Sequence, residues 1–143
     1  MLKYLIAVIL IGHGLIVGAQ SLGNFGGGSS QPANPAWLSW WPTTLGRSWL
    51  LATLKLEGTL IDRVFGLFWL ASGLCIVAAA LGVLGFIIPH TLWRTLAIYG
   101  ASGSLILLLL YLHPFFIVGI LVDVATLAAL LWAKWPPATL IGA

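Results

Sequence analysis

The chain has 143 residues, of which 61% are hydrophobic and only 6% are charged, and its mean hydropathy is +1.10. A soluble domain carries about 25% charged residues, so the composition excludes a soluble fold and predicts one small membrane domain. The net charge of +3 comes from scattered basic residues that form no patch for nucleic acid. The single cysteine, Cys75, excludes an internal disulfide and a cysteine-based metal site.

The chain begins with an apolar segment at residues 2–22 that is long enough to cross a hydrocarbon core of about 30 Å as a helix. A basic residue followed by an apolar run is also typical of a cleavable signal peptide. Because the segment suffices for a complete span, we interpret it as the first transmembrane helix.

The next segment, residues 23–59, has the glycine, serine and proline content of a loop but also carries Trp37, Trp40, Trp41 and Trp49. Indole rings favour the headgroup level of a membrane, where the ring is buried and its N–H stays hydrated. The loop is therefore expected to lie on the membrane surface. Residues 50–61 are too short and too charged to span, so we expect an interfacial helical segment there.

Three further apolar segments predict spans at residues 60–88, 94–112 and 115–134, and prolines follow the last two. Small and polar residues recur along one face of the second span, which should point inward. They are Asp62, Gly66, Trp69, Gly73, Ile76 and Ala80. The sequence thus predicts an all-α polytopic membrane protein, a single domain over residues 1–143, folded as an up-down bundle of four transmembrane helices with a Trp-rich interfacial first loop.

Flanking charges and aromatic residues indicate how the bundle sits in the membrane. Basic residues number three on each side, but those on the side of the termini lie on short flanks, which favours both termini in the cytoplasm of a bacterial-type cell. Aromatic residues are expected to form two interfacial belts. Tyr4, Trp93, Trp132 and Trp135 would mark the side of the termini, and Trp37 to Trp49, Trp69 and Tyr111 the side of the loop.

Two polar residues are expected inside the bilayer at the same depth. His13 in the first span and Asp123 in the fourth both lie about 12 to 13 Å from the loop side, at a rise of about 1.5 Å per residue. An unpaired carboxylate at this depth is costly, so the two side chains are predicted to form a hydrogen bond. The pair could lock the bundle or handle protons or a ligand. Further candidates for lining a ligand site are Gly73, Ser104, Trp69 and Gln20.

Other kinds of site were weighed on the remaining polar residues. No metal site is expected, because His90 and His113 fall at opposite interfaces and cannot converge with His13 and Asp123. The glycines on either side of His13 would let a flat tetrapyrrole approach, so a tetrapyrrole, a quinone, a lipid and no cofactor all stay open. The charges before the second span are expected to form an interfacial set. They are Lys55, Glu57, Asp62 and Arg63.

Three stretches of the chain resemble small four-helix membrane proteins of the DoxX-like type. They are GHGLIVG at 12–18, EGTLIDRVFGLFWLASGLCIVAAALG at 57–82 and VDVATLAALL at 122–131. The resemblance covers most of the span pattern, whereas the long Trp-rich loop departs from it. Relatives of this type include a subunit associated with thiosulfate and quinone oxidoreduction, so the resemblance implies a partner protein and a quinone near the bundle.

The sequence favours a non-catalytic accessory or structural subunit of a larger membrane complex, such as one of electron transport. The chain is mostly membrane span, leaves little room for an aqueous catalytic domain and contains no hydrolase, P-loop, dinucleotide-binding or zinc-protease motif. The expected partners are the lipid bilayer and larger membrane subunits, without nucleic acid. The alternative is a DoxX-like bundle that binds a quinone or lipid, or relays protons, through His13 and Asp123.

Overall fold

The computed structural model describes residues 1–26, 33–56, 58–137 and 139. Its described part contains four helical segments long and apolar enough to span a membrane, as predicted. The first three are α1 (Leu2–Phe25), α3 (Thr59–Leu84) and α4 (Trp93–Leu110). The fourth starts with a 3₁₀ turn (Pro114–Phe116), continues as α5 (Ile117–Leu127) and ends in a π-helical turn (Ala128–Trp132). The chain is thus a multi-pass, all-helical membrane protein.

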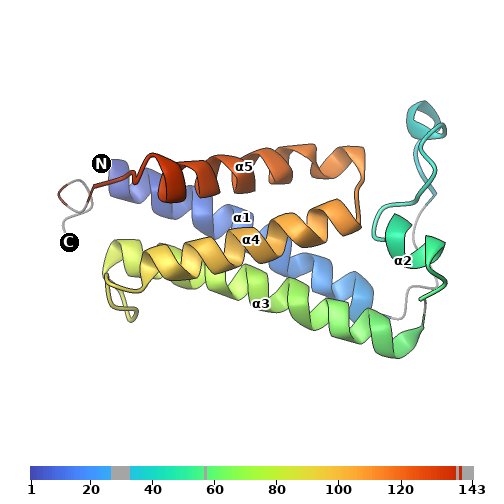
Figure 1. Cartoon of the computed structure of the whole chain (residues 1–143), viewed down its shortest axis with the longest axis horizontal. Helices are drawn as coiled ribbons and strands as arrows, with labels where there is room; N and C mark the ends of the chain where they lie inside the picture. Colours follow the sequence, from blue (N-terminus) through green and yellow to red (C-terminus); the bar gives the residue numbers. More distant parts are fainter. Residues whose placement is uncertain (27–32, 57, 138, 140–143) are drawn as a thin grey trace.

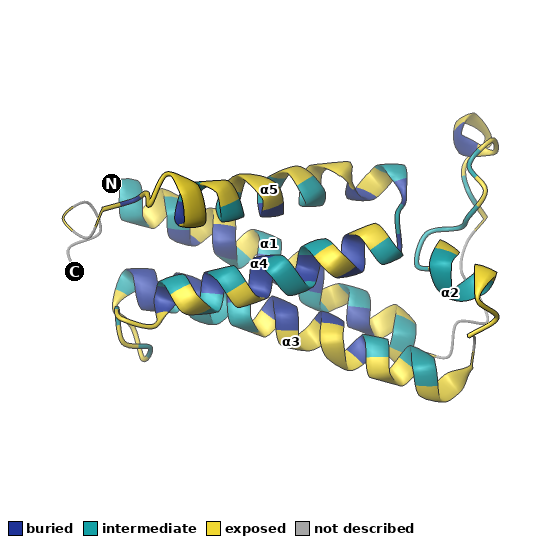
Figure 2. Cartoon of the chain, in the orientation of Figure 1, coloured by how far each residue is buried: buried dark blue, intermediate teal, exposed yellow. Residues whose placement is uncertain are grey.

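The four spans run alternately up and down, so both termini lie at one end of the bundle and the Trp-rich loop lies at the other (Figure 1). α1 packs on α3, α3 on α4 and α4 on α5, whereas the α1 and α5 backbones make few direct contacts. Buried residues follow the faces where helices meet, and much of α5 is exposed (Figure 2). The seam between α1 and α5 is therefore the loosest side of the bundle.

The contact between α1 and α3 is close because glycines line both sides. A Cβ built on Gly73 would lie only 2.6 Å from the carbonyl oxygen of Gly14 and from the backbone nitrogen of Gly18. Small residues of this kind let helix backbones approach inside a membrane, where van der Waals packing drives association. Five residues of the predicted inward face of the second span, Gly66, Trp69, Gly73, Ile76 and Ala80, are buried as predicted, whereas the sixth, Asp62, is only partly buried.

The third helix in chain order, α3, ends four residues before the predicted boundary at residue 88. Gly85 adopts a left-handed conformation with φ 71°, and the next residue, Phe86, donates its N–H to the carbonyl of Leu81 at 2.9 Å. This pattern of backbone hydrogen bonds is the Schellman ending that glycine favours. An apolar run alone does not reveal such an ending, which is why the predicted span was too long.

Most of the described loop is fastened to the ends of α4 and α5. The Ser48 hydroxyl donates to the Leu110 carbonyl at 2.7 Å and also accepts from the N–H of Leu51, which caps α2 (Trp49–Thr53). The Trp49 Nε1 group donates to the Leu109 carbonyl at 2.8 Å. The helical segment expected within residues 50–61 is present but short: helix α2 stops at Thr53, and the next helix starts at Thr59.

A second fastening joins His113, just before the 3₁₀ turn, to the start of the described loop. The His113 Nε2 atom lies 3.2 Å from Asn34 Oδ1, while its Nδ1 accepts the Phe115 N–H at 3.3 Å. This pairing defines a neutral imidazole with its proton on Nε2. Burial lowers the pKa of His113 below its usual value, which favours the same neutral form. The Trp-rich loop and His113 therefore lie at the same end, as predicted.

Three aromatic residues are wrongly placed by the belt prediction. Trp69, Tyr111 and Trp93 are buried in the core, with at most 4% of each residue exposed. The rings of Trp69 and Tyr111 pack in a T-shaped arrangement with centroids 5.7 Å apart, so they contact each other rather than reaching the headgroups. By contrast, Trp41 is partly buried, and the remaining belt candidates are exposed; they are Tyr4, Trp37, Trp40, Trp49, Trp132 and Trp135.

Candidate functional site

The predicted contact between His13 and Asp123 is present. His13 Nε2 lies 2.8 Å from Asp123 Oδ1, and the Asp123 side chain is fully buried. A proton on either atom makes this contact a hydrogen bond that joins α1 to α5 across the loose seam. Among the described residues it is the only hydrogen bond between these two helices.

The neighbouring residues explain why the two side chains meet. Gly14 packs against α3, so His13, one residue and about 100° away around the helix, is turned toward α5. Asp123 is the only buried residue of α5. Gly119, one turn before Asp123, lies beside the pair, and a Cβ there would be in ordinary van der Waals contact with His13 Cε1 at 3.7 Å. Small residues beside each partner therefore orient the pair.

Three buried polar atoms within the spans lack a hydrogen-bond partner in the described part of the chain. They are Asp123 Oδ2, Ser104 Oγ and Trp69 Nε1. A buried polar group left unpaired costs about 1–3 kcal/mol. The three atoms belong to three different helices, α3, α4 and α5, and no hydrogen bond to a described residue offsets the cost of burying them.

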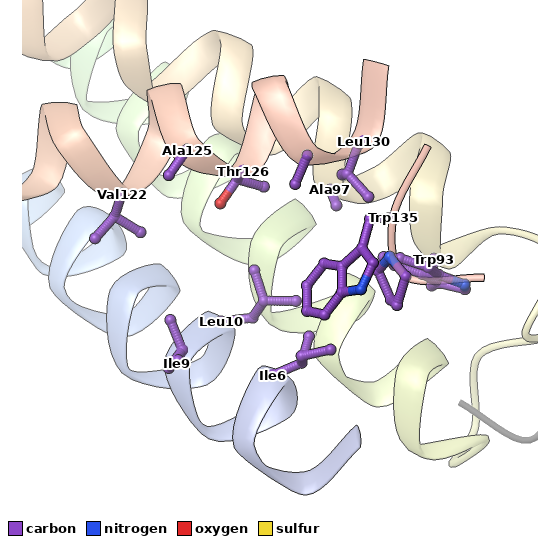
Figure 3. A pocket seen from close by; sticks show the side chains of 12 residues that line it. Ile6, Ile9, Leu10, Trp93, Ala97, Val122, Ala125, Thr126, Leu130 and Trp135 are labelled. Atoms are coloured by element: carbon purple, nitrogen blue, oxygen red, sulfur yellow. The ribbon is translucent and has the colours of Figure 1, made fainter. Parts of the chain in front are cut away.

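The seam between α1 and α5 is hollowed into an apolar groove with two halves, which share Ile9 and Val122. The half toward the termini has a volume of about 360 Å³, and the half toward the loop has a volume of about 290 Å³. Trp93 and Ala97 of α4 also line the first half, and Trp135 lies beside Trp93 (Figure 3). His13 lines the loop-side half.

Both halves of the groove open toward the lipid-facing side of the bundle. Ile9, Ile16 and Val118 line the groove, and each is about half exposed or more, at 49%, 64% and 70%. The groove is therefore accessible from the hydrocarbon core of a membrane. Its volume approaches that of small-molecule sites, which enclose about 300–1,000 Å³.

A smaller polar pocket of about 100 Å³ continues the groove toward the loop. It shares Gln20, Trp69 and Phe116 with the loop-side half of the groove. At its edge, the Tyr111 hydroxyl donates to Asn24 Oδ1 at 3.1 Å. The groove thus passes from an apolar section near the termini, past the His13 imidazole, to a section with several hydrogen-bonding groups.

Two of the candidate lining residues are correctly placed and two are not. Gln20 and Trp69 line the groove and the polar pocket. Gly73 instead packs against the backbone of α1, and Ser104 is buried without lining the groove. Lys55, Asp62 and Arg63 lie at or near the start of α3 and line neither the groove nor the pocket, while Glu57 lies outside the described residues.

Sequence reasoning missed the apolar wall of the groove and the position of Trp135, which lines the half of the groove toward the termini. Arg94 donates from Nη2 to the carbonyl of Lys134 at 3.0 Å and also to the carbonyl of Pro136. These bonds fold the chain that follows the fourth span back over the groove and place Trp135 in its lining. The pair of prolines after a tryptophan is only a weak signal of this turn in the sequence.

Metal and tetrapyrrole binding can be tested against the same geometry. No group of three potential metal ligands is formed by the described residues. His13 Nε2, the atom that would ligate a tetrapyrrole, is engaged by Asp123, so ligation would have to break that bond. The groove is better suited to a molecule held by shape and hydrogen bonds than to one held by ligation.

Comparison with protein-family models, curated proteins and solved structures gave no match to this chain. The fold and the site therefore define its class: a four-helix, multi-pass membrane protein with a lipid-facing groove and a buried histidine–carboxylate pair. The resemblance to DoxX-like proteins stays a prediction from the sequence. Function has to be argued from the groove.

Proposed function

We propose that this protein binds a long-chain, lipid-soluble molecule of the quinone or lipid class in the groove between α1 and α5. The observation that carries the proposal is an apolar groove whose two halves, about 360 and 290 Å³ in volume, both border Ile9 and Val122, with His13 lining the loop-side half and bonded to Asp123. Apolar pockets with a few convergent polar groups are the usual form of small-molecule sites.

The His13–Asp123 pair supports a proton-handling role for the same site. The hydrogen bond holds a proton beside the groove, and the second carboxylate oxygen, Asp123 Oδ2, has no partner. Ionisable residues inside a membrane are expensive, and they often mark substrate or proton pathways. A quinone bound in the groove would meet a group able to give up or accept a proton.

The test is to identify what copurifies with the protein. Protein extracted in mild detergent and washed should retain a quinone or lipid that chromatography and mass spectrometry can quantify. Val122→Trp fills the point where the two halves meet and should reduce the bound amount to background. Leu121→Trp adds the same ring to the neighbouring, 61% exposed position, which lines neither half, and should retain the ligand. Equal retention by both variants would refute the proposal.

A role as accessory subunit of a larger membrane complex is the second candidate. It is favoured by the exposed rings of the loop: Trp37 and Trp40 are 65% and 70% exposed, and Trp37 packs edge-on against Phe115. Such a patch would suit a partner subunit at the membrane surface, in a bacterial-type cell membrane with both termini in the cytoplasm. The same purification tests it, since stoichiometric larger partners would support this role.

A further inference from the structure

We infer that the polar pocket at the loop end of α1 is a head-group site for an uncharged lipid that carries a carbonyl or hydroxyl oxygen. This inference rests on the proposed function, because the apolar chain of the same molecule would lie in the groove between α1 and α5. The pocket and the loop-side half of the groove adjoin each other, because Gln20, Trp69 and Phe116 line both. A molecule with its chain in the groove would thus have its head beside these three residues.

The requirement for an accepting oxygen comes from Trp69. Its indole Nε1 group can only donate a hydrogen bond, is fully buried and has no acceptor within the described part of the chain. Trp69 lines both the pocket and the loop-side half of the groove. A carbonyl or hydroxyl oxygen bound there would satisfy the donor, whereas a pure hydrocarbon would leave it unpaired.

The neighbouring polar groups leave the indole without a partner inside the protein. Asn24 already accepts from the Tyr111 hydroxyl through Oδ1 and donates through Nδ2 to the Gln20 backbone carbonyl. The side-chain amide of Gln20 makes no hydrogen bond to the described residues and can supply a second contact to the head group. The pocket therefore offers two donors to one incoming oxygen or to two adjacent ones.

The requirement for an uncharged head comes from the charges around the groove. No lysine or arginine lines the groove or the pocket. His13 lines the groove and bonds the buried Asp123, and Tyr111, which lines the pocket, lies close enough to Asp62 to be influenced by its negative charge. A phosphate head would be taken out of water beside a carboxyl group without a cation to compensate it, which is costly in a low dielectric. Phospholipids are therefore disfavoured relative to uncharged lipids.

The experiment compares three probes with the purified protein in detergent: a decyl-substituted benzoquinone, decylbenzene and phosphatidylglycerol. The first two share a chain and a ring but differ in their oxygens. A single hydrogen bond changes affinity by about fivefold, so the wild-type protein should bind the benzoquinone about fivefold more tightly than decylbenzene. Trp69→Phe removes the donor and keeps an aromatic ring, and it should bring the two affinities together.

Two controls separate the lost donor from a general disturbance of the fold. Trp40→Phe changes an exposed indole that lines neither the groove nor the pocket and should preserve the preference for the quinone. Gln20→Leu removes the second donor without touching the core ring, and it should also weaken the preference. Phosphatidylglycerol should bind at least tenfold more weakly than the benzoquinone to the wild-type protein.

The outcomes distinguish this inference from the proposal on which it rests. Suppose that Val122→Trp abolishes probe binding but that Trp69→Phe and Gln20→Leu leave the preference for the quinone unchanged. The binding groove is then supported, and the head-group site is overturned. The head-group site is also overturned if phosphatidylglycerol binds as tightly as the quinone. It is likewise overturned if the pocket holds only water, so that the wild-type protein does not prefer the benzoquinone over decylbenzene. If no probe binds, or if Val122→Trp does not reduce the binding of any probe, the proposed function itself is overturned.

Discussion

Replacing Asp123 by leucine tests the energetic role of the buried pair most directly. Leucine resembles aspartate in size, so the change removes the hydrogen bond without leaving a large cavity. The His13 imidazole, 9% exposed at its side chain, would lose its partner. A buried group left unpaired costs about 1–3 kcal/mol, and we expect a loss of stability of that size. Asp123→Asn should stay close to wild type, because an amide can still form a hydrogen bond with the imidazole.

A double-mutant cycle isolates the bond from other effects of the substitutions. His13→Leu combined with Asp123→Leu should be more stable than the sum of the single changes predicts, because an apolar pair leaves no group unsatisfied. Hydrogen bonds between transmembrane helices are measured at about 0.6 kcal/mol on average and up to about 1.7, so a coupling energy of about 0.5–2 kcal/mol is expected.

The assay is reversible unfolding in mixed micelles, followed by circular dichroism, with the free energy of unfolding extracted for each variant. Ser48→Ala combined with Asp123→Leu provides the control cycle, because Ser48 caps α2 and bonds the end of α4. That pair should be additive within about 0.5 kcal/mol. Additivity of the His13 and Asp123 changes as well would refute the claim that their bond stabilises the bundle.

Three further predictions concern packing, pH and topology. Gly73→Leu should destabilise the bundle by about 1–3 kcal/mol in the same assay, because its Cβ would lie 2.6 Å from backbone atoms of α1. Gly12→Leu should not destabilise it, because a Cβ at Gly12 would have no neighbouring atom within 4 Å. Burial lowers the pKa of His113, so the unfolded chain binds the proton more readily; stability should fall as the pH drops below about 6.5, and His113→Gln should flatten this dependence. In vesicles, cysteines at Thr43 and Thr91 should be labelled from opposite sides, and labelling from one side would contradict the fold.

The span pattern and the buried pair were predictable because their signals are chemical. Apolar length marks a span, and an intramembrane carboxylate such as Asp123 needs a partner at its own depth, which the sequence offers in His13. The Schellman ending of α3 at Gly85 depends on backbone conformation, so the apolar residues that follow hid it. Tyr111 and Trp93 were misplaced because an aromatic residue near a span end is equally compatible with the core, whereas Trp69, ten residues inside α3, lies too deep for an interfacial belt.

The groove was not predictable because it results from the absence of close packing between two helices, α1 and α5. Gly14 and Gly73 draw α1 against α3, and this leaves α1 without a comparable contact to α5. The residues that line the resulting gap, such as Ile9 and Val122, carry no chemical signal in the sequence. Gly73 shows the same limit: its small size was recognised, but only the structure shows that a backbone, rather than a ligand, uses the space.

The structural and the ligand-handling interpretations of His13 and Asp123 are therefore linked. Their hydrogen bond is the only one between α1 and α5 among the described residues, and His13 lines the loop-side half of the groove that the proposal fills. A molecule that enters the groove must fit beside this bond or exchange partners with it. Trp69 Nε1, which is buried and unpaired within the described residues, would gain a partner from a polar head, so residues that line the groove take part in both binding and stability. Repeating the double-mutant cycle with a bound quinone would show whether the coupling between the two residues changes with occupancy, as a ligand-handling pair requires.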